Sequence, residues 1–203
     1  MHRTASHRIL AAFGLATLLS LGACSSSAPP PPVLGDIRFQ DRPPYRMLAS
    51  AVEFDDQFQP SFRPPQVEQN MSVPPQRAMH NWIADRIQAA DPSSPNHIQV
   101  TITDARVVAV PLQPTLTGLQ ATFTSQQTTR YEAHVAMTIA IIDGHGLPVR
   151  RASANASLSR SISEDATVND RDRLLWDMSR QVTSALGQQL ERQIDGGFAP
   201  YLQ

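Results

Sequence analysis

Two long alternating segments joined by a glycine-rich turn constrain the fold of this chain more than any other feature. From Arg130 to Ile142, apolar side chains occupy every second position: Tyr131, Ala133, Val135, Met137, Ile139 and Ile141. From Leu147 to Ile162, small and apolar side chains again share one parity, opposite serine and asparagine: Ala152, Ala154, Ala156, Leu158 and Ile162. The intervening Asp143-Gly144-His145-Gly146 tolerates the positive φ angles of a hairpin turn. The two segments therefore predict an antiparallel hairpin with one apolar and one polar face.

A first amphipathic helix is expected from Pro75 to about Ala90. Pro74-Pro75 is a helix-start signal, because proline at the first helical position loses no hydrogen bond, and Asp91-Pro92 ends the pattern. Its apolar stripe consists of Met79, Trp82, Ile83, Ile87 and Ala90. Arg86 falls within this stripe, so we expect it either to extend past the apolar contacts or to pair with an acid.

A second helix is expected from about Asp170 to Ile194, with Asn169 and Asp172 forming its capping arrangement and Gly196-Gly197 ending it. At about 1.5 Å per residue it would be about 37 Å long. Its broad apolar face is formed by Leu174, Leu175, Met178, Val182, Ala185, Leu186 and Leu190.

The remaining segments predict two more strands. Tyr45–Phe54 predicts a first strand, and His97–Val110 predicts another with a bulge near Asp104, while the proline-containing stretch 55–73 suits an extended loop. The expected fold class is α+β, in the order strand-helix-strand-strand-strand-helix. A mostly antiparallel four-stranded sheet would carry both helices on one face, leaving the other face polar and available.

Composition excludes several chemistries. The chain has 17 basic and 18 acidic residues, so nothing indicates nucleic-acid binding, and all the basic residues are arginine, which excludes lysine-dependent sites. Surface histidines are the favoured interpretation of His80, His97, His134 and His145, with a folded cluster of His134 with His97 or His145 as the alternative. We expect no metal, no cofactor and no enzymatic activity.

The first 24 residues predict the location of the protein. Arg3 and Arg8 precede the apolar run Ile9–Leu21, which is the layout of a signal peptide and is too short to span a bilayer. The run ends in Leu21-Gly22-Ala23-Cys24, which resembles the lipobox of bacterial lipoproteins. The resemblance implies cleavage before Cys24 and its modification with diacylglycerol and a further acyl group such as palmitate. An ordinary signal cleaved after Ala23, leaving a free thiol, is the alternative.

The domain organisation follows from this leader. We expect a signal peptide at 1–23, a lipidated Pro/Ser-rich tether at 24–44 and a single α+β domain at 45–203. In lipoproteins of enteric bacteria, aspartate after the cysteine favours retention at the inner membrane. The resemblance therefore implies that Ser25 directs the protein to the outer membrane, facing the periplasm.

The segment 111–127 is the strongest surface candidate, because no charge occurs from Pro111 to Thr129. Its apolar residues are Leu112, Leu116, Leu119 and Phe123. It is either a long hairpin packed on its own domain or a contact for a protein or lipid partner. Trp176 projects away from the centre of its helix stripe and is a second candidate contact, whereas Trp82 is expected in the core.

The order of elements after the lipobox resembles small envelope-transport lipoproteins, namely the lipopolysaccharide-assembly lipoprotein and the auxiliary lipoproteins of ABC transporters. The stretch from Pro64 to Trp82 also resembles an uncharacterised family of bacterial lipoproteins. These resemblances imply a membrane-anchored, non-enzymatic accessory protein that binds an envelope protein or lipid. The alternatives are a binder of a small apolar ligand or of peptidoglycan and, third, an envelope hydrolase. The sequence does not predict the oligomeric state.

Overall fold

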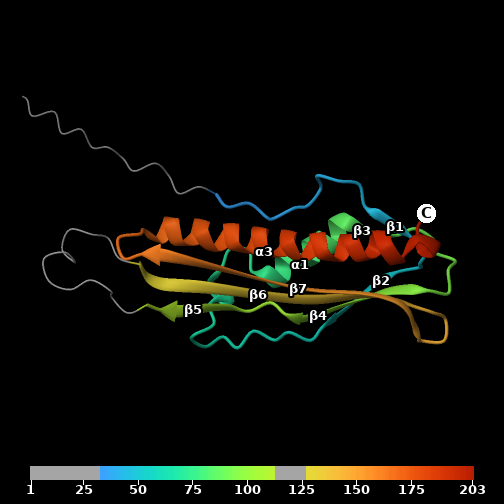
Figure 1. Ribbon diagram of the computed structural model, residues 1–203, viewed down its shortest axis with the longest axis horizontal. Coiled ribbons are helices and arrows are strands. Elements are labelled where there is room, and N and C mark those ends of the chain that lie inside the picture. The colour runs from blue at the N-terminus through green and yellow to red at the C-terminus, as the bar shows by residue number, and fades with distance from the viewer. Residues whose placement is uncertain (1–32, 113–126) are drawn as a thin grey trace, which may run out of the picture. The chain divides into compact units, whose positions relative to one another are not determined.

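The computed structural model describes residues 33–112 and 127–203 and shows an α+β fold (Figure 1). In chain order its elements are β1 (Tyr45–Met47), β2 (Val52–Asp56), the 3-10 turn η1 (Glu68–Asn70), α1 (Pro75–Arg86), β3 (Ile87–Ala89), β4 (His97–Asp104), β5 (Val107–Pro111), β6 (Gln127–Ile142), β7 (Pro148–Ser163), α3 (Val168–Gly197) and the 3-10 turn η2 (Ala199–Tyr201). The predicted fold class is confirmed.

The main sheet has five strands around the central strand β6. Both β4 and β5 pair antiparallel with the same edge of β6, and the register shifts between Ile102 and Asp104. The predicted strand with a bulge near Asp104 is therefore confirmed, and the break at Ala105 divides it into β4 and β5. β7 pairs along the other edge of β6 over its whole length. β2 pairs parallel with β4, so the sheet is mixed and has five strands where four were expected, because the segment predicted as one strand at His97–Val110 supplies two and β2 adds a parallel edge.

Two predicted elements are divided differently in the structure. The segment Tyr45–Phe54 forms two strands, β1 and β2, in different sheets. The first helix ends at Arg86, and Ile87–Ala89 forms β3, which pairs parallel with β1. Ile87 is 4% exposed. Apolar periodicity could not place this boundary, because Ile87 can be buried in either conformation and the pairing with β1 decides between them.

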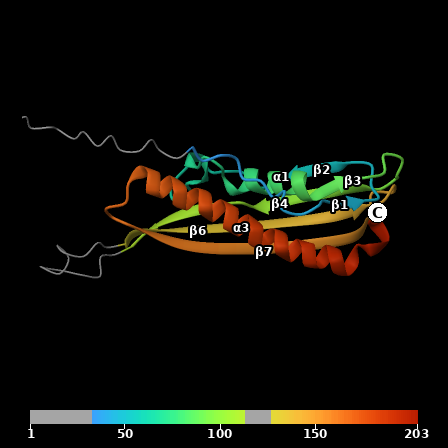
Figure 2. The same cartoon turned by 90° about the horizontal axis from the view of Figure 1, so that it is seen from above.

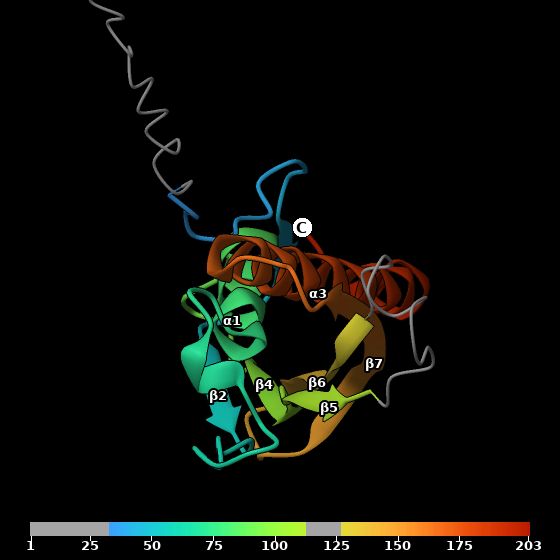
Figure 3. The ribbon, with the colours of Figure 1, turned by 90° about the vertical axis from the view of Figure 1, so that its left-hand side faces the viewer.

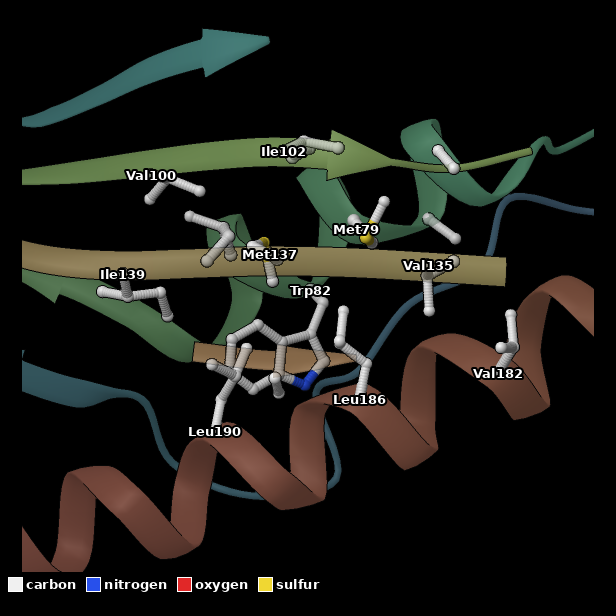
Figure 4. Packing of buried hydrophobic residues seen from close by; sticks show 14 of the residues in the cluster. Met79, Trp82, Val100, Ile102, Val135, Met137, Ile139, Val182, Leu186 and Leu190 are labelled. Atoms are coloured by element: carbon white, nitrogen blue, oxygen red, sulfur yellow. The ribbon is translucent and has the colours of Figure 1, made fainter. Parts of the chain in front are cut away.

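Both helices lie on one face of the sheet, as the views along and across them show (Figures 2 and 3). All six alternating residues predicted on the apolar face of β6 are buried. Trp82 of α1 lies between the sheet and α3, beside Leu186 and Leu190 (Figure 4). Ala152 and Ala154 of β7 are buried under α3, so the small residues of this strand allow the helix to lie close to the sheet.

The long helix α3 begins earlier than predicted. Its N-cap is Thr167, whose hydroxyl accepts the Asp170 backbone N–H while the Asp170 carboxylate accepts the Thr167 N–H. The predicted cap at Asn169 is therefore wrong, since Asn169 lies inside the first turn. The helix continues through Gly197 and has 30 residues. Ala185, which was expected on the apolar face, is exposed, because it lies beside the buried stripe that runs through Val182, Leu186 and Leu190.

Candidate functional site

Most of the residues predicted to make contacts lie outside the described part of the chain. These are Cys24, Leu116, Leu119 and Phe123. Leu112 is half-buried, and its backbone N–H donates to Thr128 O at 2.8 Å, which extends the pairing of β5 with β6. Trp176 is half-buried, and its indole Nε1 donates to Gly35 O at 2.8 Å. Trp176 therefore fastens the segment that follows the tether.

Residues 35–44, which we name the N-terminal strap, run across the two helices (Figure 2). Ile37 and Phe39 are buried in the hydrophobic core, and Ile37 O accepts from the side chain of Asn81 on α1. The predicted tether of residues 24–44 is therefore too long at its C-terminal end. Ile37 and Phe39 are only two alternating apolar residues, which is too few to predict a folded segment from the sequence. In the structure both are buried in the groove between α1 and α3.

Asp85 of α1 holds the middle of the strap. Its carboxylate accepts from the Arg38 guanidinium, from the Phe39 backbone N–H at 2.8 Å and from the Gln40 amide at 3.0 Å. The hydrogen bond from Arg38 is the main cause that lowers the pKa of Asp85 to about 2, opposed by desolvation. The carboxylate is thus held ionised by the segment that it fastens.

The Asp85 contacts predict how stability depends on pH. Because the folded pKa lies below the ordinary 3.8, the carboxylate stabilises the fold fully above that value, and this contribution is lost as pH falls through about 2. Asp85→Asn should lower the free energy of unfolding by about 2 kcal/mol near neutral pH. The difference from the wild type should shrink between about pH 4 and about pH 2.

Urea unfolding across this pH range measures the effect. Asp41→Asn is the matched control, because Asp41 lies on the same strap with a side chain 74% exposed, and it should change little at any pH. A difference between wild type and Asp85→Asn that stays constant down to about pH 2 would contradict the assignment.

A buried ion pair fastens the end of the strap. Arg86 of α1 donates twice to Glu191 Oε1 of α3, from Nε at 3.0 Å and from Nη2 at 2.9 Å, with the two side chains 4% and 10% exposed. Arg42 of the strap donates to Glu191 Oε2 at 2.8 Å, and Arg86 also donates to Pro43 O. Of the two alternatives for Arg86, pairing with an acid is therefore confirmed.

The surroundings of this pair are polar and narrow. A cavity of about 70 Å³ is lined by Phe39, Asp41, Arg42, Trp82, Arg86, Ser184, Gln188 and Glu191. The Tyr45 ring lies 5.6 Å from the Arg86 guanidinium carbon, and burial, followed by the hydrogen bond to Asp195, raises the pKa of Tyr45 to about 12. The sequence analysis did not identify Glu191 as a candidate. The available signal was its position as an acid among the apolar residues of α3, which indicates a buried charge with a partner.

The face of the sheet opposite the helices is polar, as predicted. Its polar side chains are half-buried or exposed, whereas Ala140 on the same side of β6 is buried. These polar side chains are Gln99 and Thr101 of β4, Glu132, His134 and Thr138 of β6, and Ser153, Asn155, Ser157 and Ser159 of β7. The hydroxyl groups of Thr138 and Ser153 lie 2.9 Å apart across paired strands. This face presents small hydroxyl and amide groups to its surroundings.

The histidines are separated along the sheet and the helix. His80 pairs with Asp56 at 2.8 Å, His97 with Glu53 at 3.7 Å and His145 with Asp143 at 3.8 Å. Within residues 33–112 and 127–203, no group of three or more His, Cys, Asp and Glu side chains could hold a metal ion. Over the same two ranges, no helix combines the length and the apolar character that crossing a membrane requires.

Comparisons with known proteins give weak fold similarities. No protein-family model and no curated protein matches the chain. A presumed lipoprotein of Caulobacter crescentus CB15 has 9% identity and a TM-score of 0.37, covering 71% of this chain and 85% of its own. A minor lipoprotein of Acinetobacter baumannii has 18% identity and a TM-score of 0.34, covering 77% and 98%. A presumed homologue of neuraminyllactose-binding hemagglutinin from Helicobacter pylori has 6% identity and a TM-score of 0.39, covering 81% and 95%.

Proposed function

We propose that this chain is a lipid-anchored accessory protein of the bacterial envelope that acts by binding another protein, without enzymatic activity of its own. The observation that carries the proposal is the lipobox-like Leu21-Gly22-Ala23-Cys24, which contains the only cysteine and directly follows the apolar run of the leader. Each CH₂ group of an acyl chain buried in lipid contributes about 0.8 kcal/mol, so a multiply acylated Cys24 would hold the domain firmly.

The strap limits how far the domain can lie from such an anchor. The described chain is fastened from Gly35 onward, where Trp176 holds the backbone, and Gly35 follows Cys24 by eleven positions. An extended proline-rich segment spans about 3.1 Å per residue, so the free tether reaches about 30 Å. The domain would therefore work close to the lipid surface. Ser25 favours the outer membrane and the periplasmic side, which we include in the proposal.

Two observations support protein binding over binding of a small apolar ligand beside the strap. The cavity among α1, α3 and the strap is about 70 Å³ and lined mainly by polar and charged side chains, so it suits a small apolar ligand poorly. The polar sheet face offers hydroxyl and amide groups to a partner, and the uncharged composition of the segment 111–127, which contains Leu112, Leu116, Leu119 and Phe123, supports a contact from the sequence alone. We include the contact of this segment with a protein or lipid in the proposal.

Mass spectrometry of the protein from a bacterial expression host tests the anchor. The expected product begins at Cys24, carries the added mass of diacylglycerol and acyl groups, and fractionates with membranes. Cys24→Ser should abolish both the added mass and the membrane association, because no thioether can form. Ser26→Ala, two residues away, is the matched control and should behave as the wild type. An unmodified thiol at Cys24 with release into the periplasmic fraction would contradict the proposal.

A further inference from the structure

Among the described residues, the outer edge of β7 is unpaired at Asn155 and Ser157, a stretch that we name the open window. Ser153 directs its backbone N–H and C=O away from β6, and both groups bond to the side-chain amide of Gln193 at 3.0 Å and 2.7 Å. Backbone direction alternates along a strand, so Asn155, Ser157 and Ser159 also face outward. Arg160 donates to Ser159 O at 3.0 Å. Across the described ranges, the outward N–H groups of Asn155 and Ser157 donate no hydrogen bond to the protein, and their outward C=O groups accept none from it.

A groove adjoins this window. It has a volume of about 310 Å³, lies between the N-terminal half of α3 and the C-terminal half of β7, and is lined by Arg160, Asp170, Arg173, Leu174, Asp177, Met178 and Gln181. Figure 3 shows α3 crossing above β7. On the side of β7 that faces α3, Ala156, Leu158 and Ile162 are half-buried. A strand added to β7 would therefore direct alternate side chains toward apolar groups under α3 and the others onto the polar sheet face.

The groove is lined by two arginines and two aspartates, and Arg173 is the charge in it that favours an acidic partner. In the part of the chain that the structure describes, neither Arg160 nor Arg173 has a carboxylate within 4.0 Å. The two acids of the groove have other contacts: Asp170 bonds to the N-cap Thr167, and Asp177 lies 3.6 Å from Arg180. Arg160 already donates to Ser159 O at 3.0 Å and to Gln181 Oε1 at 3.1 Å. Among the described residues, Arg173 makes no hydrogen bond and no ion pair within 4.0 Å, so its guanidinium is the group that the groove offers to a carboxylate.

We propose that this groove binds an extended segment of a partner protein, which adds to β7 as a further strand and carries alternating apolar and polar residues and a carboxylate. The apolar side chains contact Leu174 and Leu158, which are half-buried, and the carboxylate contacts Arg173, with Arg160 beside it. Main-chain hydrogen bonds at Asn155 and Ser157 supply the pairing. The inference rests on the proposed function in one respect, that the chain acts by binding a protein.

The test selects peptides and then removes single contacts. The full chain, purified in detergent, selects from a phage-displayed library of random linear peptides, and the enriched peptides are synthesised with a fluorescent label. Enriched sequences should alternate apolar and polar residues and contain an acid. Ser157→Pro should weaken binding about tenfold or more, because proline removes the outward N–H that would pair with the peptide. The variant should still fold, because an edge strand tolerates proline at an outward position. Ser157→Ala, which keeps the N–H, should bind as the wild type.

Charge reversal tests the carboxylate contact. Arg173→Glu should weaken binding about tenfold, because it replaces an attraction with a repulsion. Arg192→Glu is the matched control, because Arg192 is exposed on the same helix outside the groove, and its affinity should be unchanged. Thermal unfolding of each variant verifies that it is folded.

The outcomes separate the two proposals. Enrichment of peptides without an acid, or equal binding by the wild type, Ser157→Pro and Arg173→Glu, would overturn the groove assignment. A dimer that Ser157→Pro dissociates, without peptide enrichment, would show a second copy at the edge and would also overturn it. Peptide binding of the expected specificity by a chain whose Cys24 carries no lipid would uphold the groove and contradict the proposed anchor.

Discussion

Gly187→Ala should destabilise the protein by about 3 kcal/mol, because it forces an extra methyl group into a filled core. A Cβ atom at this position would lie 2.2 Å from Trp82 Nε1 and 2.6 Å from Trp82 Cε2. Trp82 is 2% exposed and is enclosed by the sheet and α3, so the indole has little room to move (Figure 4). Thermal or urea unfolding of the variant measures the loss.

Gly196→Ala is the matched control on the same helix. Apart from its chain neighbours and the backbone of its own helix, no described residue places a heavy atom within 4 Å of a Cβ built at Gly196. Alanine is favoured over glycine in helices by up to about 1 kcal/mol. Gly196→Ala should therefore be neutral or stabilising, opposite in sign to Gly187→Ala. Equal stability of the two variants would show that Trp82 and α3 are not packed as the structure places them.

Glu191→Ala should have an effect of similar or greater size, about 3–5 kcal/mol, because it leaves a buried charge without its partner. Arg86 is 4% exposed at its side chain and donates two hydrogen bonds to Glu191. Truncation therefore leaves its guanidinium in the core with Pro43 O as its remaining acceptor among the described residues. Arg42 loses its contact as well, so the end of the strap should loosen. Urea unfolding measures the stability, and amide hydrogen exchange over residues 38–46 measures the loosening.

Two further variants control this prediction. Asp177→Ala removes an exposed ion pair with Arg180 on the same helix and should cost at most about 0.5 kcal/mol. The double substitution Arg86→Met and Glu191→Leu should recover most of the stability lost in Glu191→Ala, because it removes both charges and keeps the volume. A loss in Glu191→Ala no larger than that in Asp177→Ala would contradict the buried pair.

The sequence predicted those elements whose periodicity has one structural solution. Alternation over residues 130–142 requires one buried sheet face, and Asp143-Gly144-His145-Gly146 permits the turn, in which Gly146 has a φ of 81°. The bulge near Asp104 was predictable because the apolar parity changes there. The end of the first helix was not, because burial of Ile87 is satisfied by either a helix or a strand.

The contacts that hold the strap, and those that leave part of the edge of β7 unpaired beside the groove, could not be predicted from the sequence. Arg38 and Asp85 are separated by 47 positions, and Arg86 and Glu191 by 105. Local patterns carry no information about which distant charge will become the partner. The same holds for the edge of β7, since only the path of α3 decides that Gln193 covers Ser153 and leaves Asn155 and Ser157 open.

By itself the sequence determined the α+β class, the long hairpin and the two amphipathic helices, because each depends on neighbouring residues. The lipid anchor at Cys24 stays a prediction from the sequence. Only the tertiary structure decided that the strap belongs to the folded unit and that Glu191 pairs with Arg86. It also decided that the missing side chain of Gly187 leaves room for Trp82. These features depend on which surfaces meet when the helices pack on the sheet. A buried ion pair and a close fit at a glycine both arise when the helices pack on the sheet, and neither produces a periodic pattern in the sequence.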